Sequence, residues 1–345
     1  MSLVNLFGEW ENYKSELAGI NFINFFLGKN LPIKKKISGF FKSRVLYFFL
    51  GIVSISELYL LLKRKKPDYI IIHLLTYIPL ILSIFFKFET KFILRISGFP
   101  KLNFFRKHLW RFASKKVDKV FCPTEETIEI LKSEKIFDDK KIYFLEDPIV
   151  QISKINKKKS EGADKEFSKK KYILAIGRLS KQKNFYLLLK FFKDISKNDK
   201  SIYLLIAGEG ELRSSLENLI YKESLQEKVK LLGFKDNIFT FLKNCHCFIS
   251  TSLWEDPGFV LIEAGATNTT IISSDCSSGP KEILSNGKGG FLFQNNNLDS
   301  LKKVYEEFTL SDEKSILLKK INVKKKSKNY TFFNHYKKIN DYLSR

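Results

Sequence analysis

Short runs of apolar residues alternate with segments of helical periodicity along most of the chain. In the first half, four apolar runs predict β-strands, at Tyr69–His73, Lys91–Ile96, Lys119–Cys122 and Tyr143–Leu145. The segments before and between these strands predict helices, over 41–64, 76–87, 104–116 and 125–133. Strands that are each followed by a helix pair in parallel, so the pattern predicts an α/β domain built on a parallel sheet.

The most informative stretch is 246–290, in which strand, loop and helix occur twice. The apolar run Cys247–Ile249 predicts a buried strand. In the loop that follows, Asp256–Pro257 has the composition of a helix start, with Asp256 as the cap and Pro257 as the first helical residue. A second strand over Thr270–Ser274 leads to a second helix, opened by Gly279–Pro280. The stretch therefore predicts two helix N-termini that follow neighbouring parallel strands.

Two such N-termini bring unpaired backbone N–H groups and positive dipole ends to one edge of the sheet, which favours a phosphate or diphosphate. Glycine at 258 and 279 lets a ligand approach the backbone. Glu255 and Glu263, with seven residues between them, can both face this edge. Carboxylates are poor phosphate ligands, but they accept hydrogen bonds from sugar hydroxyls. The edge therefore suits phosphate and sugar groups together.

The spacing of Glu255 and Glu263, with Gly258-Phe259 between them, resembles the donor-site motif of retaining glycosyltransferases of family 4. Three upstream segments occur in that family's order, ILAIGRLSKQKNF, LLIAGEGELRSSLENLI and LLGFKDNIFTFLKNCHCFISTS. EDPGFVLIEA and SSDCSSGPKEIL are most similar to enzymes that build bacterial surface polysaccharides and oligosaccharides, including lipopolysaccharide. The resemblance covers about 170–295 and implies the GT-B fold, in which two Rossmann-like domains face each other across a cleft.

The resemblance also implies roles for single residues. Glu255 would contact the hexose near its reacting carbon, while Arg178 and Lys183 would stabilise the departing diphosphate. The implied contacts to the nucleotide-sugar donor are Glu263 to the ribose hydroxyls, backbone N–H groups of Gly258 and Phe259, and further contacts from Gly177, Gly208, Gly210, Phe234, Lys235 and Leu261. No D-x-D sequence that would hold a divalent metal is present, so we expect no metal and no cofactor besides the donor substrate.

The turn GEGEL (208–212) begins like a dinucleotide fingerprint, but Arg213 stands where the third glycine would be. We interpret it as a tight turn past which a nucleobase can lie. Phe234 and Lys235 follow the next strand and can add backbone contacts to the base.

The net charge of +23 is concentrated in the first half, since 20–119 holds 20 basic and 4 acidic residues, a net charge of +16. Only eight of the 60 basic residues are arginine, and the use of Lys beside Phe, Ile and Asn is typical of a compositionally biased genome. Cations interleave with aromatic residues over 34–49, 62–69 and 102–116, as on surfaces that dock on anionic membranes. Solvated helix faces are the alternative.

We therefore predict a peripheral membrane location on the cytoplasmic side, a lipid-linked or membrane-bound glycan acceptor and no nucleic-acid partner. The candidate docking residues are Lys34, Lys35, Lys36, Lys42 and Lys107, with Phe40, Phe41 and Phe105. The run Val45–Leu62 approaches the length of a transmembrane helix, but the charge of Glu57 favours a buried core helix. The N-terminus has no basic region or cleavage pattern of a secretory signal.

The four cysteines lie in apolar contexts without a regular framework, which indicates a reducing compartment. Cys245 and Cys247 resemble half of a metal site, but no second pair exists, and we interpret them as ordinary core residues. Nothing in the sequence indicates an oligomeric state.

The N-terminal half departs from the family in two ways. Such enzymes begin with a strand, a Gly-rich loop and a helix, and we expect nothing similar before residue 20, which leaves a sheet with an exposed edge. The histidine that follows a central strand in the family is replaced by the sequence RISG, which offers Arg95 and Ser97, while His73 ends an earlier strand. An alternative to the enzyme is therefore a catalytically impaired nucleotide-sugar-binding or partner protein.

Three regions are expected in total: an N-terminal domain over 1–165, a donor domain over 166–328 and a closing helix over 329–345 that crosses back to the first domain. The stretch 151–171 lacks periodicity and is rich in charge, Gly and Ser, so it predicts a linker or a surface excursion at the domain boundary. The strand Tyr172–Ile176 then opens the donor domain, and a helix begins near Asn184.

Overall fold

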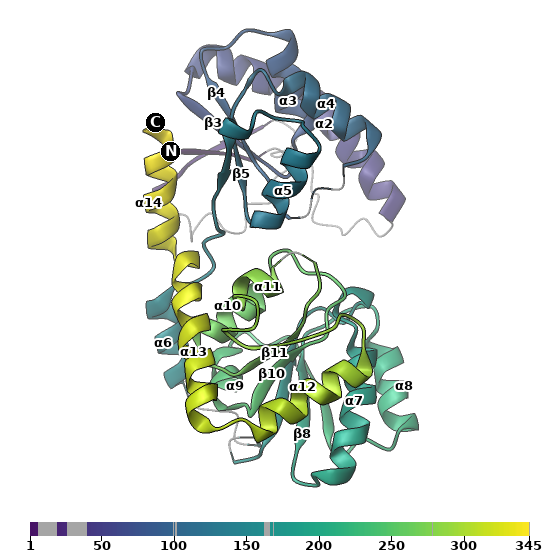
Figure 1. The fold of residues 1–345 in the computed structure, drawn as a ribbon. Helices are drawn as coiled ribbons and strands as arrows, with labels where there is room; N and C mark the ends of the chain where they lie inside the picture. The colour runs from purple at the N-terminus through teal and green to yellow at the C-terminus, as the bar shows by residue number, and fades with distance from the viewer. Residues whose placement is uncertain are drawn as a thin grey trace. The chain divides into compact units, whose positions relative to one another are not determined.

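The computed structural model describes residues 1–5, 19–25, 40–98, 100, 102–161, 166–167, 169–277 and 279–344, with the backbone alone for 40–50. The chain divides into two compact units (Figure 1). The first comprises Met1–Phe121 and Leu131–Tyr143, and the second comprises Cys122–Ile130 and Phe144–Arg345. The predicted boundaries of the three regions stay a prediction.

The first unit is built on a four-stranded sheet in the order β3-β4-β5-β6. Its strands are β3 (Tyr69–His73), β4 (Lys91–Arg95), β5 (Val117–Cys122) and β6 (Ile142–Phe144). The helices along this part of the chain are α2 (Phe40–Lys65), α3 (Tyr77–Phe85), α4 (Phe104–Ala113) and α5 (Glu125–Ser133). β3, β4 and β5 pair in parallel, as the alternation of strands and helices predicts.

The helix α2 packs closely on α3 at Gly51. A Cβ atom at this position would lie 2.0 Å from the hydroxyl oxygen of Tyr77, so only glycine allows the two helices to approach. Leu58 and Leu62 of α2 are buried, whereas Ile52 is exposed. Within the described ranges, no helix has the length and hydropathy needed to cross a membrane.

Two short strands precede this sheet. β1 (Ser2–Asn5) and β2 (Asn21–Asn24) pair in parallel, and the Asn5 amide donates to Oδ1 of Asn24 at 3.0 Å. The expectation that no strand precedes residue 20 is therefore wrong. The apolar core of β1 is only Leu3 and Val4, which is too short to show a period of two. A Gly-rich loop after β1 would fall in 6–18, outside the described residues.

The second unit contains a six-stranded parallel sheet in the order β12-β11-β10-β7-β8-β9. Its strands are β7 (Tyr172–Ile176), β8 (Tyr203–Ala207), β9 (Val229–Gly233), β10 (Cys247–Ser250), β11 (Ile271–Ser274) and β12 (Phe291–Phe293). Its helices include α7 (Phe185–Asn198), α8 (Arg213–Lys222), α9 (Phe239–Asn244), α10 (Phe259–Ala266), α11 (Pro280–Ile283), α12 (Leu298–Leu310) and α13 (Glu313–Ser327).

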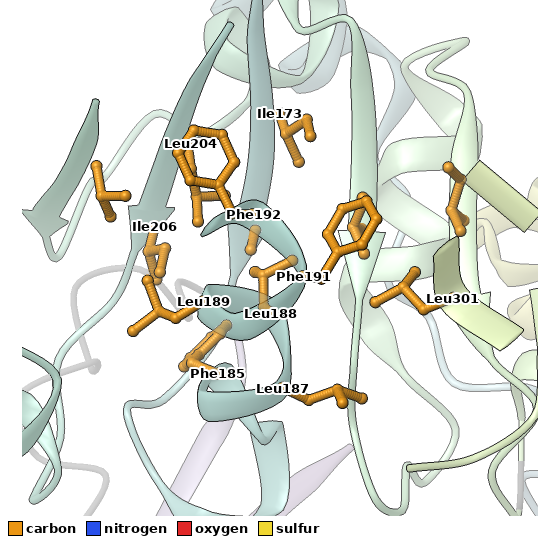
Figure 2. Close-up of a cluster of buried hydrophobic side chains, with 14 of the residues drawn as sticks. Ile173, Phe185, Leu187, Leu188, Leu189, Phe191, Phe192, Leu204, Ile206 and Leu301 are labelled. Atoms are coloured by element: carbon orange, nitrogen blue, oxygen red, sulfur yellow. The ribbon is translucent and has the colours of Figure 1, made fainter. Parts of the chain in front are cut away.

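The core of this unit lies between α7 and the central strands (Figure 2). Phe185, Leu188, Leu189 and Phe192 recur at helical spacing, and all four side chains are buried. They pack in one cluster with apolar residues of β7 and β8, among them Ile173, Leu204 and Ile206. Each buried side chain of this size contributes about 1.5–3 kcal/mol by leaving water, so the cluster anchors the sheet edge from which the site is built.

The stretch predicted as a linker or surface excursion contains a helix, α6 (Ile152–Ser160), so the prediction of a linker is wrong there, whereas a surface segment agrees with the structure. Only Ile155 of this helix is buried, which explains the missing periodicity. Tertiary contacts hold it instead, because Lys158 donates to the backbone carbonyl of Asp236 at 2.8 Å and Asn237 donates to the Lys158 carbonyl at 2.9 Å.

The C-terminal segment forms the predicted helix, α14 (Phe332–Leu343). Lys338 of this helix forms an ion pair at 2.5 Å with Glu146, and Tyr342 donates to the Phe144 carbonyl at 3.0 Å. These contacts attach α14 to the start of the second unit. That it crosses back to the first domain stays a prediction.

Candidate active site

The loops after three neighbouring strands meet at one edge of the six-stranded sheet. β10 lies between β7 and β11, so the chain after Ile176, Ser250 and Ser274 emerges at the same edge. The Ser274 hydroxyl donates to the Ser252 carbonyl at 2.6 Å and joins two of these loops. Both predicted strands in this stretch, and the second helix after Gly279, are confirmed.

At this edge the carboxylate of Glu255 is buried and held by two partners. Its Oε1 atom forms an ion pair with Nζ of Lys183 and accepts a hydrogen bond from the Ser252 hydroxyl at 2.5 Å. The side chains of Glu255 and Lys183 are only 8% and 16% exposed, so water screens this pair little. The structure thus brings together two residues that lie 72 positions apart and that the sequence analysis assigned to catalysis.

The backbone also fixes Lys183, which lies in a 3₁₀ turn over Lys181–Lys183. The Thr251 hydroxyl donates to the Lys183 carbonyl at 2.9 Å, and the Gln182 amide donates to the Trp254 carbonyl at 2.9 Å. A Cβ atom at residue 177 would lie 2.8 Å from Cε of Lys183, so Gly177 leaves room for the lysine side chain to reach Glu255.

The helix after this loop starts later than predicted. α10 begins at Phe259, its cap is Gly258 with φ of 98°, and the Asp256–Pro257 peptide bond, which is cis, precedes it. The interpretation of Asp256 as the cap is therefore wrong, because the left-handed turn that starts the helix occurs at Gly258, where glycine adopts it without steric cost. A Cβ atom at Gly279 would lie 1.8 Å from the Pro257 carbonyl oxygen, so the two loops touch only because that residue is glycine.

Glu263 lies one turn into α10 and is half-buried. Burial raises the pKa of its carboxyl to about 7. Phe259, at the start of the same helix, is exposed, whereas Leu261 is buried and its N–H donates to the Gly258 carbonyl at 3.0 Å. Leu261 thus supports the turn, while Phe259 and Glu263 remain accessible to a ligand.

The glycines of the GEGEL turn are required by backbone packing. A Cβ atom at Gly208 would lie 1.9 Å from the Gly177 carbonyl oxygen, and one at Gly210 would lie 2.4 Å from the Leu179 carbonyl oxygen. The turn therefore lies directly against the loop that carries Arg178, whose side chain is exposed. Arg213, which stands in place of a third glycine, forms an ion pair at 2.7 Å with Glu209.

Two further predicted residues follow β9. Phe234 is exposed, and the Lys235 ammonium lies 5.9 Å from the ring centroid of Phe241. An exposed aromatic ring beside the GEGEL turn suits contact with a flat nucleobase.

The sequence analysis missed Ser252 and Ser274 as parts of the site. The run Ser250-Thr251-Ser252 marks the end of a strand, but only the fold reveals that one hydroxyl faces Glu255. Within the described ranges, no group of three or more His, Cys, Asp or Glu side chains is arranged to hold a metal ion.

Comparison with known proteins identifies relatives. The family model described as "Glycosyl transferases group 1" matches residues 156–326. An uncharacterized glycosyltransferase of Methanocaldococcus jannaschii is 33% identical over 242 residues, which cover 65% of this chain and 59% of that protein. The GalNAc-alpha-(1->4)-GalNAc-alpha-(1->3)-diNAcBac-PP-undecaprenol alpha-1,4-N-acetyl-D-galactosaminyltransferase of Campylobacter jejuni is 30% identical over 257 residues, which cover 73% and 67%. The chain thus spans about three fifths to two thirds of the length of these two relatives.

Solved structures share the fold at low sequence identity. A glycosyltransferase from Rickettsia africae aligns with a TM-score of 0.78 and 16% identity, covering 99% of this chain and 88% of that one. Anabaena HepE in complex with UDP aligns with a TM-score of 0.71 and 15% identity, covering 96% and 89%.

Proposed function

Because the chain belongs to the group 1 family of glycosyltransferases and has the GT-B fold, we propose that it is a retaining hexosyltransferase of the family 4 type. Its donor is a nucleotide-diphosphate hexose or N-acetylhexosamine, and its acceptor is a lipid-linked or membrane-bound glycan in the synthesis of a cell-surface polysaccharide. One observation carries this proposal: the buried Glu255 carboxylate is held by Lys183 and Ser252 at the carboxyl ends of the strands, beside the start of α10.

The donor lies along this edge with its diphosphate near the start of α10, where the backbone N–H groups of Gly258 and Phe259 precede the intrahelical hydrogen bonds and can donate to phosphate oxygens. Arg178 and Lys183 neutralise the diphosphate, Glu263 accepts hydrogen bonds from the ribose hydroxyls, and the base lies near the GEGEL turn. With this phosphate charge met by side chains and a helix dipole, the reaction requires no metal ion.

The reaction breaks the bond between the anomeric carbon and the diphosphate oxygen. The acceptor hydroxyl attacks from the same face, and its proton passes to the departing phosphate oxygen. The Glu255 carboxylate stabilises the positive charge that develops at the anomeric carbon, while Lys183 and Arg178 stabilise the negative charge on the leaving group. Lys183 therefore exchanges its ion pair with Glu255 for one with the diphosphate.

A lipid-linked acceptor is supported by the names of several relatives. Two from Campylobacter jejuni and one from Escherichia coli are named for transfer to undecaprenol diphosphate-linked sugars. Membrane attachment at the cytoplasmic face is part of the same proposal, and α4 supports it: Phe105 and Phe112, seven residues apart on one helix face, are exposed beside Arg111. Lys107 contributes less charge, because it forms an ion pair with Glu134. The candidate docking residues over 34–42 lie outside the described side chains.

The catalytically impaired alternative rests on the absence of both a first strand and a Gly-rich loop. β1 provides a strand before residue 20, which removes the first of these two grounds, while the loop would fall in 6–18, outside the described residues.

The proposal is tested by measuring sugar transfer and donor hydrolysis with Glu255→Gln and Arg178→Ala. Glu227→Gln, an exposed residue outside the site, is the control. We expect each site variant to lower turnover by at least a hundredfold and the control to be active. Wild-type turnover in both site variants would refute the assignment, and nucleotide binding without turnover by the wild type would restore the alternative.

A further inference from the structure

A cavity lies within the first unit, and its described lining residues include none of those assigned to the donor. It has a volume of about 210 Å³ and opens where β3 and β4 end. Ligands of open parallel sheets bind outside the carboxyl ends of the strands, so this is the position at which the first unit would hold one. A volume of this size has room for several water molecules at about 30 Å³ each, and therefore for a small anion.

Positive charge dominates the lining. Arg95 and Arg106 both line the cavity, and none of the described lining residues is acidic. Arg95 ends β4 and is 7% exposed, so water screens its charge little. The Ile96 N–H donates to the Phe121 carbonyl at 2.9 Å, which fixes the backbone directly after Arg95.

Contacts among neighbouring side chains hold the other polar groups of the lining in place. The N–H of Arg106 donates to the side chain of Asn103 at 2.9 Å at the start of α4, and its guanidinium carbon lies 5.9 Å from the ring of Trp110. The buried Trp110 indole donates to the Thr76 hydroxyl at 3.4 Å. Since Thr76 accepts this hydrogen bond, its own O–H can donate to a ligand in the cavity.

Thr76 is also the cap residue of α3, a helix of nine residues, and its side chain does not bond to the helix backbone. The positive end of the α3 dipole therefore adds to the two guanidinium groups. Planar guanidinium groups bind phosphate oxygens in pairs, and hydroxyl donors complete such a site.

We propose that this cavity binds a phosphate or diphosphate group of the acceptor. The identity of the acceptor rests on the proposed function, whereas the anion site itself rests on the cavity and its arginines. The same chemistry occurs in the donor, so the experiment has to separate the two sources.

The first arm measures binding of inorganic pyrophosphate by calorimetry to Arg178→Ala, whose donor site is weakened. UDP and GDP cannot serve as blocking ligands, because each carries a diphosphate that would also enter the cavity. We expect pyrophosphate to bind at one site, with an affinity at least tenfold weaker when Arg106→Ala or Arg95→Met is added. Arg111→Ala is the matched control, because Arg111 lies on the same helix and donates instead to the Glu134 carbonyl. Arg106 is only half-buried, so its variant tests the site even if Arg95→Met fails to fold. Loss of all pyrophosphate binding in Arg178→Ala, or an unchanged affinity after Arg106→Ala is added, would overturn the proposal.

The second arm measures transfer to a prenyl diphosphate-linked sugar and to the same sugar as an alkyl glycoside. Arg106→Ala should raise KM about tenfold for the first acceptor, with kcat nearly unchanged, and leave the second unaffected. An equal rise for both acceptors overturns the assignment to the acceptor diphosphate. Absence of turnover in the wild type speaks against the proposed function, while the pyrophosphate arm still decides the anion site.

Discussion

The ion pair between Lys183 and Glu255 makes a prediction about stability that does not depend on activity. Lys183→Met leaves the Glu255 carboxylate, only 8% exposed, without its counter-ion, while the Ser252 hydroxyl still donates a hydrogen bond to it. Breaking a buried pair on one side costs about 3–5 kcal/mol, because a charge stays buried without its counter-ion. In the double variant Lys183→Met/Glu255→Gln no charge is left, so we expect it to recover at least about 2 kcal/mol of the loss.

The assay is urea unfolding followed by the fluorescence of Trp254, which neighbours Glu255, with Trp10 and Trp110 replaced by Phe. The control is the same cycle on Lys302 and Asp194, a pair 2.6 Å apart whose side chains are 39% and 37% exposed. Exposed pairs couple by about 0–1 kcal/mol. If the coupling of Lys183 with Glu255 is no larger than that of the control, the pair is screened by water and the reasoning fails.

Three further predictions concern single features of the two units. Glu263 has a pKa of about 7 in the folded protein, against 4.5 for the free side chain. As pH rises from about 4.5 to 7, Glu263 loses its proton in the unfolded state but keeps it in the folded state, so the free energy of unfolding falls over this range. Glu263→Gln should therefore match the wild type at pH 4 and be more stable at pH 8 by about 1–3 kcal/mol, and equal pH profiles in urea unfolding would contradict the raised pKa. Gly208→Ala should lower the melting temperature by several degrees, because its Cβ would meet the Gly177 carbonyl oxygen. Gly287→Ala, at a residue that also has a positive φ but whose Cβ would lie 4.0 Å from the Gly290 carbonyl oxygen, should cost less, and similar losses in calorimetry would argue against the contact at Gly208. The double variant Phe105→Ser/Phe112→Ser should sediment less with anionic vesicles at low salt than the wild type, whereas the control Phe333→Ser on α14 should sediment as the wild type does. If the wild type bound neutral and anionic vesicles equally, an electrostatic contribution to membrane binding would be excluded.

Much of the sheet could be predicted from sequence, because its strands are short apolar runs. Tyr69–His73 and Tyr172–Ile176 have the predicted bounds in the structure, since each is a mostly apolar run between polar segments. Elements that depend on distant contacts could not be predicted. The single buried residue of α6 gives no period, and β1 is too short to show one.

The start of α10 was misplaced for a related reason. Asp and Pro are common at helix starts, but the helix begins where the backbone can turn, at Gly258. In the site, Glu255 and Lys183 were predicted from the resemblance to a glycosyltransferase family. The role of Ser252 could not be found in this way, because a serine next to a strand end becomes a carboxylate partner only when a particular loop geometry turns its hydroxyl inward.

The same geometry has a consequence for donor binding. In the structure the Lys183 charge is already paired with Glu255, so an incoming diphosphate has to displace a carboxylate and then lies beside a second negative charge. Glu255→Gln removes both costs. We therefore expect this variant to bind a nucleoside diphosphate about tenfold more tightly, a gain of about 1.4 kcal/mol, although its turnover is at least a hundredfold lower. Calorimetry with UDP and GDP on the wild type, Glu255→Gln and the control Glu227→Gln measures this effect. Weaker binding by Glu255→Gln would mean that Glu255 holds Lys183 in position for the phosphate instead of competing with it, and partner exchange by Lys183 would have to be abandoned as the first step of the reaction.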